Sequence, residues 1–269
     1  MVSVSLMQAS FLRPLRSCLC CGGFDLEPLL DLGQHYLTDF LDAPVLDHPK
    51  APLTLMLCNE CLFAQLSHIV DRERLFRSYH YASGVNATIK KHLFDLANDL
   101  LVRLGLKASD IIVDIGANDG TFLRSFPGFM GQRVGFEPAL NLKGAAEAGG
   151  NAIISEFFTK QAFLDRFGTG KRAKLVTALA MFYDLEHPVA FCQDVADILA
   201  PDGLFVVEMN YLGSILTQNA YDTIGHEHLG MYYLSTFNRV VRQAGMEVVD
   251  VSANSLNGGS FRLFCRKRP

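Results

Sequence analysis

The sequence predicts an α/β fold, a doubly wound and mainly parallel sheet with a smaller, cysteine-rich domain in front of it. From residue 110 onward, short apolar runs alternate with amphipathic segments, as strands alternate with crossover helices. Before residue 80 the periodicity is poor and cysteines occur in closely spaced pairs. We therefore expect a first domain at residues 1–80 and a second at 81–269.

An amphipathic helix is predicted over residues 86–106, where apolar side chains recur at steps of three and four and Gly105 can end the helix. Strands are expected in the apolar runs that follow, which span residues 110–116, 132–138, 151–155, 173–180, 203–210, 246–252 and 260–265. Helices are expected between them at residues 139–148, 160–167, 187–199 and 235–244.

Composition and charge exclude several classes of protein. A net charge of −4 gives no reason to expect nucleic acid or an anionic membrane as a partner. No apolar run has the length of a membrane-spanning helix, and residues 1–17 lack the features of a signal peptide. We expect a cytoplasmic protein with reduced cysteines. The sequence does not indicate an oligomeric state.

Two C-x2-C pairs, Cys18/Cys21 and Cys58/Cys61, have the spacing of a four-cysteine zinc site. Four thiolates leave no position for water, which indicates a structural rather than a catalytic ion. Cys20 could take the place of Cys18, although the spacing favours Cys18. The alternative for the whole set is buried, unpaired thiols.

A buried strand at residues 111–115 leads into the glycine-rich pattern D-x-G-x-N-D-G, which contains Asp114, Gly116, Asn118 and Asp119. Gly116 allows a ligand to approach the backbone closely. The next predicted strand ends in Glu137, where an acidic side chain can accept hydrogen bonds from both hydroxyls of a ribose. Together they favour an adenosine-bearing cofactor. An ordinary strand-to-helix turn and a nicotinamide enzyme are the alternatives.

The loop and Glu137 resemble the S-adenosylmethionine site of class I methyltransferases, and we expect that fold. In that family the glycine loop contacts the amino-acid part of the cofactor, the acid holds the ribose, and an aromatic side chain flanks the adenine. The resemblance assigns this last role to Phe157 or, preferably, Phe158.

Five motifs in the same order are similar to those of sugar C-methyltransferases, which act on nucleotide-linked keto-deoxysugars. They are P-L-x-L-x-x-C-x-x-C, Y-x-Y-x-S-G, D-I-G-x-N-D-G, D-T-I-x-H-E-H-L and G-G-S-x-R, at Pro52–Cys61, Tyr79–Gly84, Asp114–Gly120, Asp222–Leu229 and Gly258–Arg262. The resemblance implies S-adenosylmethionine as cofactor, structural Zn2+ and a small-molecule substrate, possibly a nucleotide sugar.

In that family a histidine of the H-E-H motif is a general base, which maps to His228 with Glu227 beside it. A carbon next to a ketone must lose a proton before it can attack a sulfonium methyl group, and an imidazole suits that task. His226 and Tyr79 complete the expected catalytic group. A metal site at the two histidines and a purely structural role for them are the alternatives.

Tyr81 and Ser83, with Tyr79, are expected to close over the cofactor or substrate; packing at the domain junction is the alternative. Arg262 is expected either to meet an anionic substrate group or to form a surface salt bridge.

The sequence also departs from the family pattern. Gly225 replaces a tyrosine, Asn257 replaces a histidine, and the stretch with Tyr183 and Asp184 lacks another histidine. A further C-terminal domain of the family is expected to be missing, or else the chain is a shorter relative with another substrate. The rival functions are an O- or N-methyltransferase and a non-catalytic zinc-containing cofactor-binding protein.

Overall fold

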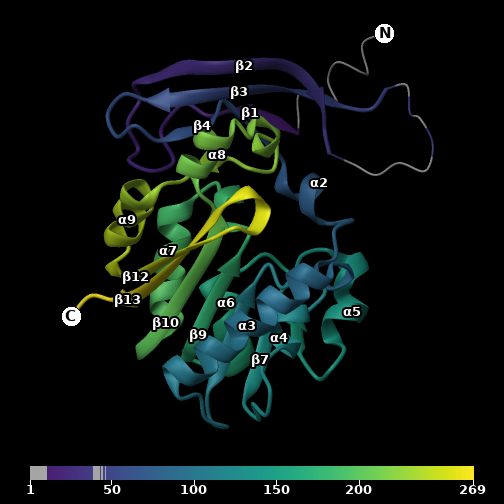
Figure 1. Ribbon diagram of the computed structural model, residues 1–269, viewed down its shortest axis with the longest axis vertical. Coiled ribbons are helices and arrows are strands. Elements are labelled where there is room, and N and C mark those ends of the chain that lie inside the picture. The colour runs from purple at the N-terminus through teal and green to yellow at the C-terminus, as the bar shows by residue number, and fades with distance from the viewer. Residues whose placement is uncertain (1–10, 39–42, 44, 46) are drawn as a thin grey trace.

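A computed structural model describes residues 11–38, 43, 45 and 47–269 of the chain. A small antiparallel sheet lies across one end of a larger, helix-covered sheet (Figure 1). The first ten residues of the N-terminal stretch that we assessed as a signal peptide lie outside the described residues.

The large sheet has seven strands in the order β12-β13-β10-β9-β6-β7-β8. Their bounds are Ile111–Ile115 for β6, Gln132–Phe136 for β7, Ala152–Ile154 for β8, Ala173–Leu179 for β9, Leu199–Asn210 for β10, Met246–Asn254 for β12 and Ser260–Lys267 for β13. The pairs from β8 to β10 are parallel, and β13 runs antiparallel to both of its neighbours. The predicted mainly parallel sheet is confirmed.

Helices cover both faces of this sheet (Figure 1). They are α3 (Ala87–Leu104), α4 (Thr121–Arg124), α5 (Lys143–Glu147), α6 (Lys160–Phe167), α7 (Pro188–Ile198) and α9 (Leu234–Gln243). The helix α8 (Leu212–Gln218) packs instead against the small sheet. Asn86 caps the start of α3 and Gly105 ends it in the left-handed conformation. The helix expected at 139–148 is shorter and broken, with a 3-10 turn, η2 (Leu140–Leu142), before α5.

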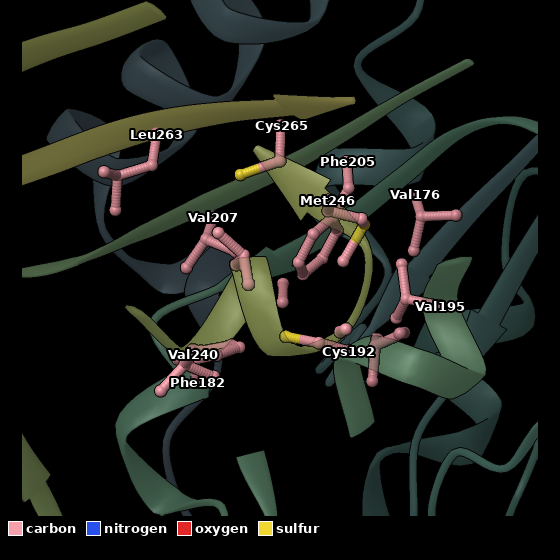
Figure 2. Close-up of a cluster of buried hydrophobic side chains, with 14 of the residues drawn as sticks. Val176, Phe182, Cys192, Val195, Phe205, Val207, Val240, Met246, Leu263 and Cys265 are labelled. Atoms are coloured by element: carbon pink, nitrogen blue, oxygen red, sulfur yellow. The ribbon is translucent and has the colours of Figure 1, made fainter. Parts of the chain in front are cut away.

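The core lies on the two faces of the sheet because successive side chains of a strand point to opposite sides. In β10, Phe205 and Val207 face α7 and α9, whereas Leu204 and Val206 face α3 and α4. Figure 2 shows the first of these clusters, in which Cys192 and Cys265 are buried among apolar side chains.

The small sheet has the order β11-β4-β3-β2, and a further pair, β1 and β5, lies apart from it. Bounds are Leu12–Pro14 for β1, Leu26–Tyr36 for β2, Lys50–Cys58 for β3, Ala64–Leu66 for β4, His68–Val70 for β5 and Gly230–Met231 for β11. The short helix α2 (Arg72–Phe76) comes after β5.

Sequence periodicity missed β2 because this edge strand is largely exposed and has no buried face to impose alternation. The strand β11 comes from the far end of the chain.

None of the helices within the described residues combines the length and the apolar character that a bilayer-spanning helix requires.

Candidate active site and zinc site

The thiols of Cys18, Cys21, Cys58 and Cys61 all lie within 4.8 Å of one another. The Sγ atoms of Cys18 and Cys61 are 3.6 Å apart, as are those of Cys21 and Cys58. Tetrahedral zinc with Zn–S bonds of about 2.3 Å places sulfur atoms about 3.8 Å apart. The four thiols therefore fit one zinc ion and form the one group of three or more potential metal ligands among the described residues.

Two similar turns bring these thiols together. The amide of Gly22 donates to the carbonyl of Cys18, and the amide of Leu62 donates to that of Cys58, both over 2.8 Å. Both Gly22 and Leu62 have positive φ angles. The Cys20 thiol donates to the carbonyl of Thr236 and is not a member of this four-thiol group, which supports Cys18 as the ligand.

A cavity of about 600 Å³ opens at the carboxyl ends of β6, β7 and β9. The chain leaves β6 on one side for β7 and later crosses to the other side for β9. This reversal of strand order is where ligands bind in open α/β sheets. Gly116, Asn118, Glu137, Phe158, Tyr79, Tyr81 and Ser83 line the cavity, as do Tyr183, Asp184 and Glu208.

Glu137 is held at the rim of this cavity by backbone donors. Its Oε2 accepts from the amide of Asn118 over 2.7 Å, and its Oε1 accepts from the amide of Ala139 over 2.8 Å. Burial raises the pKa of Glu137, while the two amide bonds oppose that rise. Each carboxylate oxygen can accept a second hydrogen bond, so Glu137 can still receive ribose hydroxyls.

The glycine loop brings its backbone close to the cavity. Gly116 has a φ of +73°, and a Cβ atom there would lie 3.1 Å from Cγ of Met181. Asn118, two residues further along the loop, also has a positive φ.

The side chains of Asn118 and Asp119 hold the segment 81–84 against the loop. Asn118 accepts from the amide of Ser83 and donates to the carbonyl of Tyr81, and Asp119 accepts from the amide of Gly84. This places Tyr81 and Ser83 on the cavity wall. Asp119 itself is not among the lining residues of the described part of the chain.

Asp114 is not among the described residues that line the cavity. It is buried in β6 and accepts a 2.6 Å hydrogen bond from Thr177 of β9. Burial raises the pKa of Asp114 to about 8, against the lowering effect of that bond. Its position favours a role in fixing β6 to β9 at the start of the loop.

Both candidate adenine residues line the cavity. Phe158 packs edge-on against Phe136 and Phe191, with ring centroids 5.0 and 5.4 Å apart. The guanidinium carbon of Arg72 lies over the ring of Phe157, 4.3 Å from the ring centroid. Phe158 is therefore the one whose ring belongs to the apolar wall.

The H-E-H motif forms a turn, closed by a hydrogen bond from the amide of His228 to the carbonyl of Gly225. The two imidazoles consequently point to different places. His226 is 4% exposed, and its Nε2 lies 3.1 Å from the carbonyl of Ala51 in the small sheet. His226 thus lies away from the cavity lining and has a structural hydrogen bond.

His228 packs its ring against Tyr183, with centroids 4.3 Å apart, and Tyr183 forms part of the cavity wall. Its Nδ1 lies 2.7 Å from the carbonyl of Thr223. A carbonyl only accepts, so Nδ1 carries the proton and Nε2 keeps its lone pair. Burial lowers the pKa of His228, which favours this neutral form.

Glu227 lies beside a second cavity of about 290 Å³, which shares Tyr79 and Tyr81 with the first. The Tyr79 hydroxyl donates to Oε2 of Glu227 over 3.2 Å. Burial raises the pKa of Glu227, and this hydrogen bond opposes the rise.

Sequence reasoning missed two acidic residues of the cavity wall. Asp184 was noted only as a departure from a family pattern. Glu208, at the end of β10, forms a buried network with His92 and Arg262, its carboxylate oxygens lying 2.5 Å from His92 Nε2 and 2.7 Å from Arg262 Nε. Arg262 is therefore in a buried ion pair, not in a surface salt bridge. Only its place inside the continuous apolar run of β10 could have signalled Glu208 as an acid within a buried strand.

Comparisons with known proteins agree with this arrangement. The family described as "Methyltransferase domain" matches residues 89–251, and the family described as "Putative zinc binding domain" matches residues 18–76. The chain is 31% identical over 255 residues to C-methyltransferase NovU of Streptomyces niveus, covering 94% of this chain. The match spans 61% of that protein.

Two solved structures share the fold. An S-adenosylmethionine-dependent methyltransferase from Clostridium acetobutylicum superposes with a TM-score of 0.52 at 10% identity, covering 67% of this chain and 92% of that one. The mitomycin 7-O-methyltransferase MmcR superposes with a TM-score of 0.51 at 13% identity, covering 68% and 55%. The chain therefore belongs to the methyltransferase family, with the class I S-adenosylmethionine-dependent fold and an N-terminal zinc-binding region.

Proposed function

We propose that the protein methylates a carbon next to a ketone, on a nucleotide-linked deoxysugar, with His228 as the general base. The observation that carries this proposal is the hydrogen bond from His228 Nδ1 to the Thr223 carbonyl. It leaves Nε2 unprotonated on a ring that is not itself among the described lining residues but packs against Tyr183 of the cavity wall. The 31% identity to a C-methyltransferase supports the same reaction.

In this proposal Glu137, Gly116 and Asn118 hold the cofactor, with Phe158 against its adenine and Tyr81 and Ser83 closing over it. Asp114 and Asp119 act indirectly, through the strand and the segment that they fix. When bound, S-adenosylmethionine supplies a methyl group whose carbon–sulfur bond breaks as the new carbon–carbon bond forms.

His228 Nε2 takes the proton from the acceptor carbon, and the electron pair of that bond moves into the carbonyl as an enolate. An imidazole that is neutral at physiological pH is well matched to this task. Glu227 stabilises the resulting imidazolium electrostatically, and Tyr79 fixes the position of Glu227.

Two assays test this proposal with a panel of nucleotide-linked keto-deoxysugars. Methyl transfer is followed by NMR of the product, which distinguishes a new C-methyl group from an O- or N-methyl group. Deuterium exchange at the carbon next to the ketone, with S-adenosylhomocysteine in place of the methyl donor, reports deprotonation alone.

We expect His228→Asn to reduce both rates about 10²- to 10⁴-fold and to leave cofactor affinity unchanged, while His35→Asn, on the exposed strand β2, has no effect. Undiminished exchange in His228→Asn would remove His228 as the base. An O- or N-methylated product would refute carbon methylation.

A further inference from the structure

Asp184 is partly buried, and its carboxyl group accepts no hydrogen bond from the described residues. It ends η3 (Phe182–Asp184), directly after β9, and lines the main cavity. Its Oδ1 is sealed from solvent without a partner. The other described side-chain atoms in that condition belong to Asn151 and Ser155, which carry no charge. Asp184 is thus the one ionisable group among them.

The titratable groups around Asp184 include several acids. The charge of Glu227 acts on Asp184, and Asp184 acts in turn on Tyr79 and Tyr183. The same cavity is lined by Glu186, His187 and Glu208, and His228 packs against Tyr183. Among the described lining residues the single lysine or arginine is Arg72, and it stacks on Phe157. No cation therefore compensates a charge on Asp184.

Ionisation of Asp184 is consequently unfavourable. An unpaired charge in such a place costs more free energy than a neutral carbonyl oxygen without a donor. Burial first, and the negative charge of Glu227 second, raise the pKa of Asp184 well above its ordinary value.

The two carboxyl groups have different surroundings. Glu227 accepts a hydrogen bond from Tyr79, which favours its ionised form. Asp184 receives none from the described residues. Neighbouring carboxyl groups with different environments commonly divide the acid and base roles of a site.

We propose that Asp184 is a neutral carboxylic acid whose hydroxyl donates a hydrogen bond to the carbonyl oxygen of the acceptor. The inference rests on the proposed function. As His228 removes the proton from carbon, the electron pair reaches that oxygen, and the hydrogen bond from Asp184 strengthens as negative charge develops. The proton stays on Asp184 throughout, so His228 alone changes its protonation. Such a donor acts on the transition state more than on the bound ketone.

An infrared experiment tests the protonation state without any substrate. The carbonyl stretch of a protonated carboxyl group is recorded at neutral pH for the full chain with zinc and S-adenosylhomocysteine bound. Asp114, whose pKa burial raises to about 8, contributes a band of its own, so the spectra are compared as differences. We expect a protonated-carboxyl band in the spectrum of the wild type minus Asp184→Asn, and none in that of the wild type minus Asp197→Asn, which alters an exposed aspartate. A difference spectrum showing only a carboxylate would overturn the proposal.

The donor role is tested by exchange and methyl transfer on the same keto-sugar panel. Asp184→Asn retains an N–H donor, so we expect its rates to stay within about tenfold of wild type. Asp184→Ala should lose about 10²- to 10³-fold, with unchanged S-adenosylhomocysteine affinity and a folded thermal transition. The wild-type rate should fall at high pH as Asp184 ionises, and Asp184→Asn should lack this decline.

Equal rates for the Ala and Asn variants would overturn the donor role. If no sugar of the panel reacts with the wild type, the proposed function fails, and the infrared band still decides whether Asp184 is neutral.

Discussion

The Tyr79 hydroxyl donates a hydrogen bond to Glu227 Oε2 and so joins the segment before α3 to the turn that carries His228. Tyr79 and Glu227 are 148 positions apart in the chain. This bond lies where the two cavities meet, since Tyr79 lines both.

Removing this bond should affect the site more than the fold. We expect Tyr79→Phe to lower methyl transfer about tenfold and the free energy of unfolding by about 1 kcal/mol, the usual net value of one hydrogen bond. Product formation and chemical denaturation measure the two effects. The matched control is Tyr36→Phe on the exposed edge strand β2, which should change neither.

The zinc site should stabilise the small sheet. Cys58→Ser removes one thiolate of the cluster, so we expect zinc content to fall and the thermal transition to drop by several degrees, because metal binding couples to folding. Elemental analysis and calorimetry measure both quantities. Cys20→Ser is the matched control, since Cys20 bonds to Thr236 instead. Equal zinc loss in both variants would contradict the assigned ligand set.

Glu137 should account for a large part of cofactor affinity. Glu137→Gln puts an amide where two backbone amides now donate to a carboxylate. We expect S-adenosylhomocysteine to bind at least tenfold more weakly, about 1.4 kcal/mol, in isothermal titration calorimetry. Glu147→Gln, on the surface of α5, should bind normally. Unchanged affinity in Glu137→Gln would show that the ribose is held elsewhere.

The Glu208 network should make stability dependent on pH. Its bonds with His92 and Arg262 lower the pKa of Glu208 against the opposing effect of burial. The folded state therefore binds this proton less readily than the unfolded chain does. The free energy of unfolding that Glu208 contributes is fully present above its pKa in the unfolded chain, about 4.3. This contribution is lost as pH falls through the lower pKa of Glu208 in the folded protein.

Breaking the pair from one side tests this account. Arg262→Met leaves a buried acid with only His92 and Asn254 as partners, and we expect a loss of about 2–4 kcal/mol in urea denaturation at neutral pH. The double variant with Glu208→Gln should recover much of that loss. Without recovery, the effect of Arg262→Met would be one of packing rather than charge.

Local features of the chain determined much of the structure. The apolar periodicity of residues 86–106, with Asn86 and Gly105 at its ends, specified α3. The C-x2-C spacing specified the zinc ligands because each turn is closed within five residues. The order of strand, glycine loop and Glu137 likewise predicted the cofactor edge of a parallel sheet.

Tertiary structure decided which distant groups meet. Tyr79 with Glu227, and His92 with Glu208, come together only because the sheet order and the returning strand β11 bring their segments to one place. The buried, unpaired state of Asp184 Oδ1 has the same origin, because an atom's partners and solvent access depend on neighbours supplied by several strands and turns. Local periodicity sets the conformation of each segment, whereas these contacts follow from how the segments pack.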